Sequence, residues 1–266
     1  MKINVCTVLL GQYDFLAPVH ADLKTRKDWK FFCYSDVPVT TDGWISKMLP
    51  EEIGELSVFL QTRYIKIFCQ ALGEEEGLYI YTDSNLDLLP EFVELVDLFN
   101  DSGAPLGVIR HPVRLNITEE VEALWGSQKI SGRKNMLKKQ LEHYQRADDY
   151  YNLSTLFENS IIFKIAGNRE LDHLMTDWWA ELNTWPTRDQ ISFPYVLFQH
   201  NINYFCFTVN LRASPNLVRF RGHKSGDFKD IHAFLHARAN SFLFRCLLTV
   251  WQPFHNALVK TIGRGI

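Results

Sequence analysis

The chain of 266 residues carries 28 lysine and arginine residues against 31 aspartate and glutamate residues, and 46% of it is hydrophobic. This length and composition are typical of a soluble globular protein with one large domain or two small ones. A nucleic-acid-binding protein more often carries a basic excess, so the net charge of −3 disfavours that class. We therefore expect no nucleic-acid partner.

The cysteines and the apolar runs indicate where the protein works. None of the five cysteines forms a C-x-x-C pair, which predicts buried free thiols in a reducing compartment. The first ten residues predict a strand rather than a signal peptide, and no apolar run approaches the ~20 residues of a membrane span. We therefore expect a cytoplasmic protein. The cysteines are Cys6, Cys33, Cys69, Cys206 and Cys246.

Apolar segments typical of strands alternate with helical patterns along much of the chain. The helical patterns cover residues 59–71, 91–99 and 169–185, with Pro90 near one helix start and Gly73 near one helix end. Strands alternating with helices predict an α/β sandwich with a mostly parallel central sheet. The predicted strands are residues 3–10, 29–34, 44–48, 78–81, 106–110 and 156–165.

Two later segments differ from this pattern. Residues 126–151 are highly charged, which predicts a solvated helix or a lid over a site. Residues 229–266 are apolar, aromatic and basic and predict a helical tail beyond a main domain of residues 1–228. Packing onto the domain is the ordinary role of such a tail. Peripheral attachment to an anionic membrane and a subunit contact are the alternatives.

Three predicted strand ends carry polar residues, and ligands bind at such ends in open α/β sheets. Gly11, Tyr13 and Asp14 follow the first strand, where a turn alone explains them and Tyr13 offers a face for a flat base. Asp83 and Asn85 flank Ser84 in a tight turn after "LYIYT". Two oxygen donors there suit Mg²⁺ or Mn²⁺, although an Asx-type turn produces the same letters.

The third polar segment is "TRDQISFPY", in which Arg188, Asp189 and Gln190 precede an apolar helix. Asp189 near a helix start is explained by capping alone, worth about 1 kcal/mol. A cation, a carboxylate and an amide side by side are more than a cap requires. We therefore treat the three residues as candidates for a catalytic site.

These segments in this order resemble a glycosyltransferase-like family of plant Golgi proteins linked to mucilage and turgor phenotypes, with bacterial relatives. The resemblance rests on "VCTVLLGQYDFLAPV", "WKFFCYSD", "TRYIKIF", "LYIYTDSNLDLL", "VIRHPVRLNITEEVEAL" and "TRDQISFPYVLF". It implies the GT-A fold, a Rossmann-like nucleotide-binding sandwich. It also implies transfer of a sugar, hexosyltransferase-like, from a nucleotide-diphosphate donor, with a UDP-sugar favoured. The acceptor would be a glycan or lipid-linked molecule in polysaccharide biosynthesis.

The resemblance also implies roles for individual residues. The aspartate-x-aspartate turn of the family corresponds to Asp83, Ser84 and Asn85, where the neutral Asn85 replaces an acid and weakens the case for a metal. Asp189 becomes the catalytic carboxylate, supported by Arg188 and Gln190, and His223 a third metal ligand. Asp189 would be the general base of an inverting enzyme, or would position the donor sugar and stabilise its anomeric carbon in a retaining one. Glu119 and Glu120 are expected only to interact favourably with the dipole of a helix that begins near them. Donor binding falls to Thr7, Gly11, Tyr13, Asp14, Arg63, Lys66, Asp83, Ser84, His111, Arg114, Asn159 and Lys224.

Two other functions remain open at this point. A sugar-1-phosphate nucleotidylyltransferase needs a basic, glycine-rich loop after the first strand, and "GQYDFLAPV" has one glycine and no lysine or arginine. A non-catalytic protein that binds nucleotide sugars or glycans is the other alternative, because a fold alone does not confer activity and Asn85 departs from the family pattern.

Overall fold

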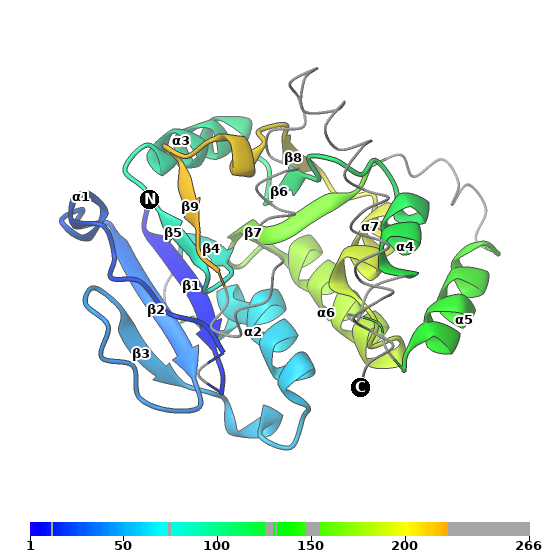
Figure 1. The fold of residues 1–266 in the computed structure, drawn as a ribbon. Coiled ribbons are helices and arrows are strands. Elements are labelled where there is room, and N and C mark those ends of the chain that lie inside the picture. Colours follow the sequence, from blue (N-terminus) through cyan, green and yellow to red (C-terminus); the bar gives the residue numbers. More distant parts are fainter. Residues whose placement is uncertain (12, 74–75, 126–129, 131, 147–154, 223–266) are drawn as a thin grey trace, which may run out of the picture. The chain divides into compact units, whose positions relative to one another are not determined.

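The computed structural model describes residues 1–11, 13–73, 76–125, 130, 132–146 and 155–222 (Figure 1). The strands are β1 (Ile3–Leu9), β2 (Trp29–Ser35), β3 (Ile45–Met48), β4 (Leu78–Thr82), β5 (Leu86–Leu88), β6 (Leu106–Arg110), β7 (Phe157–Ile165), β8 (Tyr204–Phe207) and β9 (Val218–Phe220). The helices are α1 (Ala21–Lys24), η1 (Glu51–Ile53), α2 (Val58–Leu72), α3 (Phe92–Ser102), α4 (Ile117–Trp125), α5 (Lys134–Tyr144), α6 (Arg169–Thr184), α7 (Asp189–His200) and η4 (Leu211–Ala213).

A seven-stranded sheet in the order β3-β2-β1-β4-β7-β6-β8 forms the centre of the fold. Every neighbouring pair is parallel except those of β7, which runs antiparallel to β4 and to β6. The predicted α/β sandwich with a mostly parallel sheet is therefore confirmed. The two short strands β5 and β9 pair separately as a second sheet.

Helices cover both faces of the sheet, as the continuous apolar runs of its strands require. Buried side chains of α2, α6 and α7 form one apolar core with one face of the sheet. Buried side chains of α3 form a second core with the other face. Figure 1 shows α2, α6 and α7 together on one side of the strands and α3 on the other.

The antiparallel direction of β7 decides where polar groups gather. The carboxyl ends of β1, β4 and β6 share one edge of the sheet, and β7 brings its amino end to that edge. The Asp83 amide after β4 donates a 2.9 Å hydrogen bond to the Ser160 carbonyl, and the His111 amide after β6 donates a 2.7 Å bond to the Leu156 carbonyl. These hydrogen bonds join polar segments that are distant in the chain.

The predicted strands and helices are present, with ends that differ by a residue or a few. Helix α3 begins two residues after Pro90, and α2 ends directly before Gly73. Strands β5, β8 and β9 were not predicted. They have only three or four residues each and lack a sustained apolar pattern.

The prediction of a solvated helix in the charged segment was wrong for one face of α5. Leu137, Gln140 and Tyr144 are fully buried, and the Tyr144 ring stacks on the Tyr195 ring at a centroid distance of 3.9 Å. The tail of residues 229–266 lies outside the described residues. Within the described part, Cys6, Cys33, Cys69 and Cys206 are free, and no helix is long and apolar enough to cross a membrane.

Gly107 permits the close packing of α3 on the sheet, and its replacement tests that packing. A β-carbon there would lie 2.7 Å from Phe99 Cδ2 and 2.9 Å from Phe163 Cβ. Because overpacking a dense core is costly, we expect Gly107→Ala to lower the free energy of unfolding by about 1–3 kcal/mol in urea titrations. Adding Phe99→Leu should restore part of the loss. Strictly additive effects of the two changes would contradict direct contact.

Candidate active site

Lys66 lies at the centre of a charged cluster at the carboxyl edge of the sheet. Its Nζ is 3.0 Å from Asp189 Oδ2 and 3.3 Å from Asp83 Oδ1. Asp83 directly follows β4, Asp189 is the first residue of α7, and Lys66 comes from the middle of α2. One ammonium group therefore joins three elements and brings together two carboxylates that lie far apart in the sequence.

Further contacts fix the Lys66 cluster. Arg63, one turn before Lys66, lies 3.6 Å from Asp189 Oδ1. Tyr81 Oη donates a 3.0 Å hydrogen bond to Asp83 Oδ1. Behind Lys66, the buried Lys164 of β7 donates bonds of 2.7 Å and 2.8 Å to the Lys66 and Ile67 carbonyls, which fastens α2 to the sheet.

The two carboxylates differ in exposure and therefore in what they can do. The Asp189 side chain is 4% exposed, whereas that of Asp83 is 39% exposed. Burial alone would raise the pKa of Asp189, but Lys66, Arg63 and Arg188 together hold it well below its usual range. A carboxylate that resists protonation is a poor general base. Asp189 fits a fixed negative charge better, and Asp83 is the carboxylate that reaches solvent.

Asp83, Ser84 and Asn85 form the predicted tight turn, closed by a 3.1 Å bond from the Leu86 amide to the Asp83 carbonyl. Ser84 Oγ donates a 2.8 Å hydrogen bond to Asp14 Oδ2, so the loop after β1 meets this turn. Asn85 Nδ2 donates a 3.3 Å bond to the Arg221 carbonyl. The side chains of Asp83 and Asn85 are thus held by different parts of the chain.

The described residues supply some, but not all, of the ligands that a divalent cation requires. Among them, no three His, Cys, Asp or Glu side chains gather closely enough to hold an ion. Asp83 and Asn85 are two residues apart in the turn, and Mg²⁺ is commonly held by one or two carboxylates together with phosphate oxygens. Asp83 already shares an oxygen with Lys66 and Tyr81, and Asn85 carries no charge. His223 and Lys224 lie outside the described residues.

The end of β1 differs in detail from the prediction. The Gly11 amide donates a 3.0 Å hydrogen bond to Asp36 Oδ2, which follows β2 and was not predicted as a site residue. Gly11 has φ of +57°, the left-handed region that favours glycine. Tyr13 is 54% exposed, whereas Thr7 is fully buried inside β1.

A second charged group surrounds His111 after β6. Arg114 Nη2 lies 2.9 Å from His111 Nε2, and His111 Nδ1 accepts hydrogen bonds from the Val113 and Arg114 amides. The buried Glu120 pairs with Arg114 Nε at 2.5 Å and with Arg188 Nε at 3.0 Å. Arg188 also donates to Gln190 Oε1. The predicted residues His111, Arg114, Arg188 and Gln190 are thus brought together.

Glu158 and Arg212 extend this group. Arg212 Nη2 donates a 2.7 Å hydrogen bond to Glu158 Oε1 at the start of β7. Burial raises the pKa of Glu158, opposed by Arg212 and reinforced by Asp83. Asn159, the next residue, is 3% exposed, and its side-chain oxygen and nitrogen have no hydrogen-bond partner within the described residues.

Sequence reasoning missed Glu120, Glu158, Arg212 and Asp36. Glu119 does cap α4, since its Oε2 accepts a 2.7 Å bond from the Leu115 amide and its own amide donates to Asn116 Oδ1. Glu120 has a different role from the helix-dipole contact expected of it, because it is 1% exposed and holds two arginines. A clue was available, since an acid at a buried position of an amphipathic helix needs a partner.

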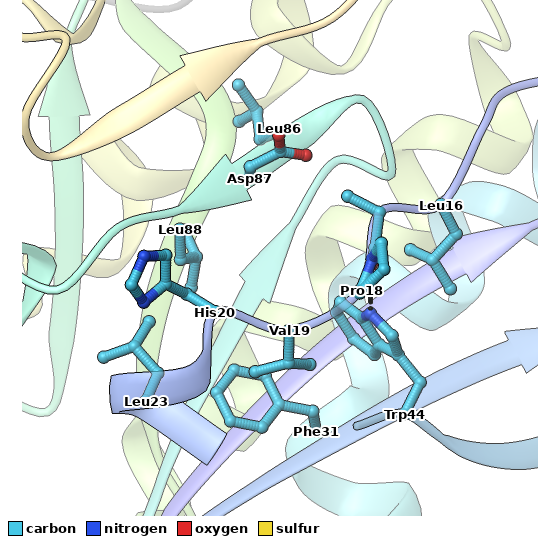
Figure 2. A pocket seen from close by; sticks show the side chains of 11 residues that line it. Leu16, Pro18, Val19, His20, Leu23, Phe31, Trp44, Leu86, Asp87 and Leu88 are labelled. Carbon is cyan, nitrogen blue, oxygen red and sulfur yellow. Dashed lines mark hydrogen bonds between the residues drawn. The ribbon is translucent and has the colours of Figure 1, made fainter. Parts of the chain in front are cut away.

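A small crevice on the α3 side of the sheet lies apart from the charged cluster. Leu16, Trp44 and Leu88 are among its lining residues, and the Trp44 indole donates a 2.8 Å hydrogen bond to the Ala17 carbonyl (Figure 2). Its volume of about 20 Å³ is enough for roughly one water molecule. This crevice is too small for a nucleotide sugar.

An α/β sandwich with converging charges at the carboxyl edge of its sheet is the architecture of a ligand-binding α/β protein. The chain belongs to the family described as TOD1/MUCI70, glycosyltransferase-like domain, whose model matches residues 66–216. Lys66, Asp83, His111, Asn159 and Asp189 all fall within the matched segment. The expected glycosyltransferase-like family is confirmed.

The chain was also compared with solved structures and with curated proteins. A crystal structure of mouse xyloside xylosyltransferase 1 in its apo form is similar, with 11% sequence identity and a TM-score of 0.43 over 80% of this chain and 86% of that chain. No curated protein matches the sequence.

Replacing Lys66 tests the cluster. Lys66→Met leaves Asp189 buried with Arg63 and Arg188 as its remaining cations, and removal of one partner of a buried pair is strongly destabilising. We expect the free energy of unfolding to fall by about 3 kcal/mol in urea titrations. Lys66→Met/Asp189→Asn should be more stable than Lys66→Met alone. If the double variant is less stable, the two groups do not form the described pair.

The pH dependence of stability tests the environment of His111. Burial, with Arg114, Arg212 and Arg188 nearby, lowers the pKa of His111 to about 3. Between pH ~6.5, the pKa of an unfolded histidine, and pH 3, the unfolded chain binds a proton that the folded chain does not. Stability must therefore fall as the pH falls through this window. Melting temperatures from pH 7 to pH 4 should drop more steeply for the wild type than for His111→Gln. Equal slopes would contradict this account.

Proposed function

We propose that the protein transfers a sugar, hexosyltransferase-like, from a nucleotide-diphosphate donor to a glycan or lipid-linked acceptor in polysaccharide biosynthesis. Membership of a glycosyltransferase-like family supports the reaction class. The observation that carries the proposal is the convergence of Asp83 and Asp189 on Lys66 at the edge where α/β sheets bind ligands. A UDP-sugar remains the favoured donor.

The charged groups suit the transition state of glycosyl transfer. Breaking the anomeric carbon–oxygen bond leaves negative charge on the diphosphate and positive charge on the sugar. Fixed charges placed beforehand stabilise both without reorganisation. Asp189, held ionised, supplies negative charge near the sugar and also orients Lys66 and Arg63. Arg188 and Gln190 hold the start of α7 in place, and Asn159 offers an unpartnered amide to sugar hydroxyls.

Mg²⁺ or Mn²⁺ is the proposed cofactor, held by Asp83 and Asn85 with His223 as a further ligand. Such an ion would neutralise charge on the leaving diphosphate. Asp83 suits this role because it is the exposed member of the Lys66 cluster. Lys224 is proposed to contact the diphosphate, and Tyr13, Asp14 and Gly11 the nucleoside. The cytoplasmic location and a membrane contact by residues 229–266 also remain proposals.

A non-catalytic nucleotide-sugar or glycan-binding protein is the second candidate. The observation that favours it is the engagement of the turn: Asn85 is bonded to the Arg221 carbonyl, and Asp83 is paired with Lys66. A site whose groups are already satisfied binds a ligand only by giving up these contacts.

Turnover assays separate the two candidates. The full chain is incubated with UDP-, GDP-, CMP- and dTDP-sugars, a mixture of acceptor glycans, and Mn²⁺ or a chelator, and the released nucleotide is measured. We expect release from one donor, lowered at least about 100-fold by Asp189→Asn because a fixed transition-state charge is lost. The exposed Asp97 of α3 provides the control variant Asp97→Asn, with unchanged turnover expected.

One result would count against the role of Asp189 and another against the transferase. Full turnover by Asp189→Asn would show that the Asp189 carboxylate does not contribute to catalysis. Saturable binding of a nucleotide sugar by the wild type, with no release on any acceptor, would support the non-catalytic protein. Thermal melting of each variant shows whether a loss of turnover reflects unfolding.

A further inference from the structure

Three arginines from separate segments surround the neutral His111. Arg114 follows β6, Arg188 precedes α7, and Arg212 lies in η4 after β8. Arg114 Nη2 lies 2.9 Å from His111 Nε2, Arg114 and Arg188 share the Glu120 carboxylate, and Arg212 joins Arg114 and Arg188 in lowering the pKa of His111 after the larger effect of burial. We call Arg114, Arg188 and Arg212, with Glu120 and Glu158, the arginine cluster.

The arginine cluster carries more positive than negative charge. Its three guanidinium groups face the two carboxylates of Glu120 and Glu158, and Glu120 serves two arginines at once. Arg188 also acts on Asp189, but the surplus remains when the Lys66 cluster is included, because five cations then face four carboxylates: Arg63, Lys66, Arg114, Arg188 and Arg212 against Asp83, Glu120, Glu158 and Asp189. His111 cannot add to or offset this charge, because it remains neutral over the physiological range. A network that served folding alone would gain by balancing its buried charges. The surplus of one cation favours an anionic ligand.

The cluster is also open on its cationic side. The side chains of Glu120 and Glu158 are 1% and 5% exposed, whereas those of Arg114, Arg188 and Arg212 are 30%, 20% and 33% exposed. The carboxylates therefore lie behind the arginines and hold them toward solvent. Guanidinium groups fixed in this way bind carboxylate or phosphate oxygens with little loss of side-chain entropy.

Unsatisfied polar atoms lie on Glu158, the partner of Arg212, and on the two residues that follow it. Glu158 Oε2, both side-chain polar atoms of Asn159, and Ser160 Oγ are buried without hydrogen-bond partners in the described part of the chain. A buried polar group without a partner destabilises the fold, so three consecutive residues of this kind call for an explanation. Successive side chains of a strand point to opposite faces, so Glu158 and Ser160 of β7 share the face on which Glu158 meets Arg212. Hydroxyl groups of a saccharide, which both donate and accept, are suitable partners there.

The position of the cluster assigns it to one of the two substrates. It lies where β6 and β8 end and β7 begins, whereas Gly11 and Asp36, the proposed nucleoside side, follow β1 and β2. The Lys66 cluster lies between them, since Arg188 directly precedes Asp189 and Asp83 contributes to the raised pKa of Glu158. An anion at the arginine cluster would thus lie next to the Lys66 cluster but away from the nucleobase of the donor.

We infer that the arginine cluster binds an oxyanion, a carboxylate or a phosphate, on the acceptor saccharide, so that the protein acts on acidic rather than neutral glycans. This inference rests on the proposed transferase function and names the acceptor class. It assigns Arg114, with its neighbours His111 and Asn159, to the acceptor, whereas the family resemblance implied donor binding for them. Arg212 is the residue that tests it most directly, because its carboxylate partner Glu158 lies outside the Lys66 cluster.

The test measures binding of defined probes to the full chain by titration calorimetry at two salt concentrations. The probes are a glucuronate-containing oligosaccharide, a phosphorylated oligosaccharide, a neutral oligosaccharide of equal length, and UDP. We expect an acidic probe to bind at least tenfold more tightly than the neutral one, and more weakly at high salt. Arg212→Gln should abolish this preference and leave UDP binding unchanged. Carboxylated and phosphorylated probes show which oxyanion is preferred.

Matched variants keep the result interpretable. Arg26→Gln removes an exposed arginine that precedes β2 and stacks on Trp29. It should leave both the preference for acidic probes and UDP binding unchanged. Glu158→Gln/Arg212→Gln removes both charges of the pair, so that no buried carboxylate is left alone, and it should also lose the preference. Melting curves confirm folding.

Three outcomes would overturn the inference. Equal binding of acidic and neutral probes would show that the surplus charge is not used. Retained preference in the folded double variant would place the anion elsewhere. Loss of UDP binding in Arg212→Gln would assign the cluster to the donor diphosphate. In each case donor turnover by the wild type still tests the proposed function separately, since that assay with a mixture of acceptors does not depend on this preference.

Discussion

The ion pairs of Lys66 with Asp83 and Asp189 are the interaction on which the site depends. A buried ammonium group is tolerated only when carboxylates or hydrogen-bond acceptors surround it, and buried carboxylates likewise need a partner. Helix α2, the end of β4 and the start of α7 are therefore fixed relative to one another by charge as well as by apolar packing. Lys164 strengthens this arrangement by holding the backbone of α2 at Lys66 itself.

The sheet topology determines why so many charges meet at one edge. Strand β7 is antiparallel to both neighbours, so its first residues join the ends of β4 and β6. Asp83, His111 and Glu158 are thereby gathered at one edge of the sheet. The charged groups therefore change along this edge of the sheet. A glycine turn and acids follow β1 and β2, the Lys66 cluster lies at β4, and the arginine cluster lies at β6 and β7.

Local features of the fold were predictable because they depend on neighbouring residues. Buried strands such as β1 and β6 are continuous apolar runs, and Gly73 and Pro90 mark helix limits. The candidates Asp83 and Asp189 were found as polar interruptions in apolar segments. Their meeting through Lys66 was not predictable, since Lys66 and Asp189 lie 123 residues apart and only the folded topology joins them. For the same reason, Glu120 was assigned to its own helix rather than to Arg114 and Arg188.

A crystal structure of the protein soaked with UDP and Mn²⁺ tests the central claim most directly. The account predicts the diphosphate against the exposed side of Asp83, with Lys66 and Asp189 still paired behind it and the base toward the end of β1. A nucleotide bound away from the carboxyl edge of the sheet, or Asp83 and Asp189 separated from Lys66, would contradict it.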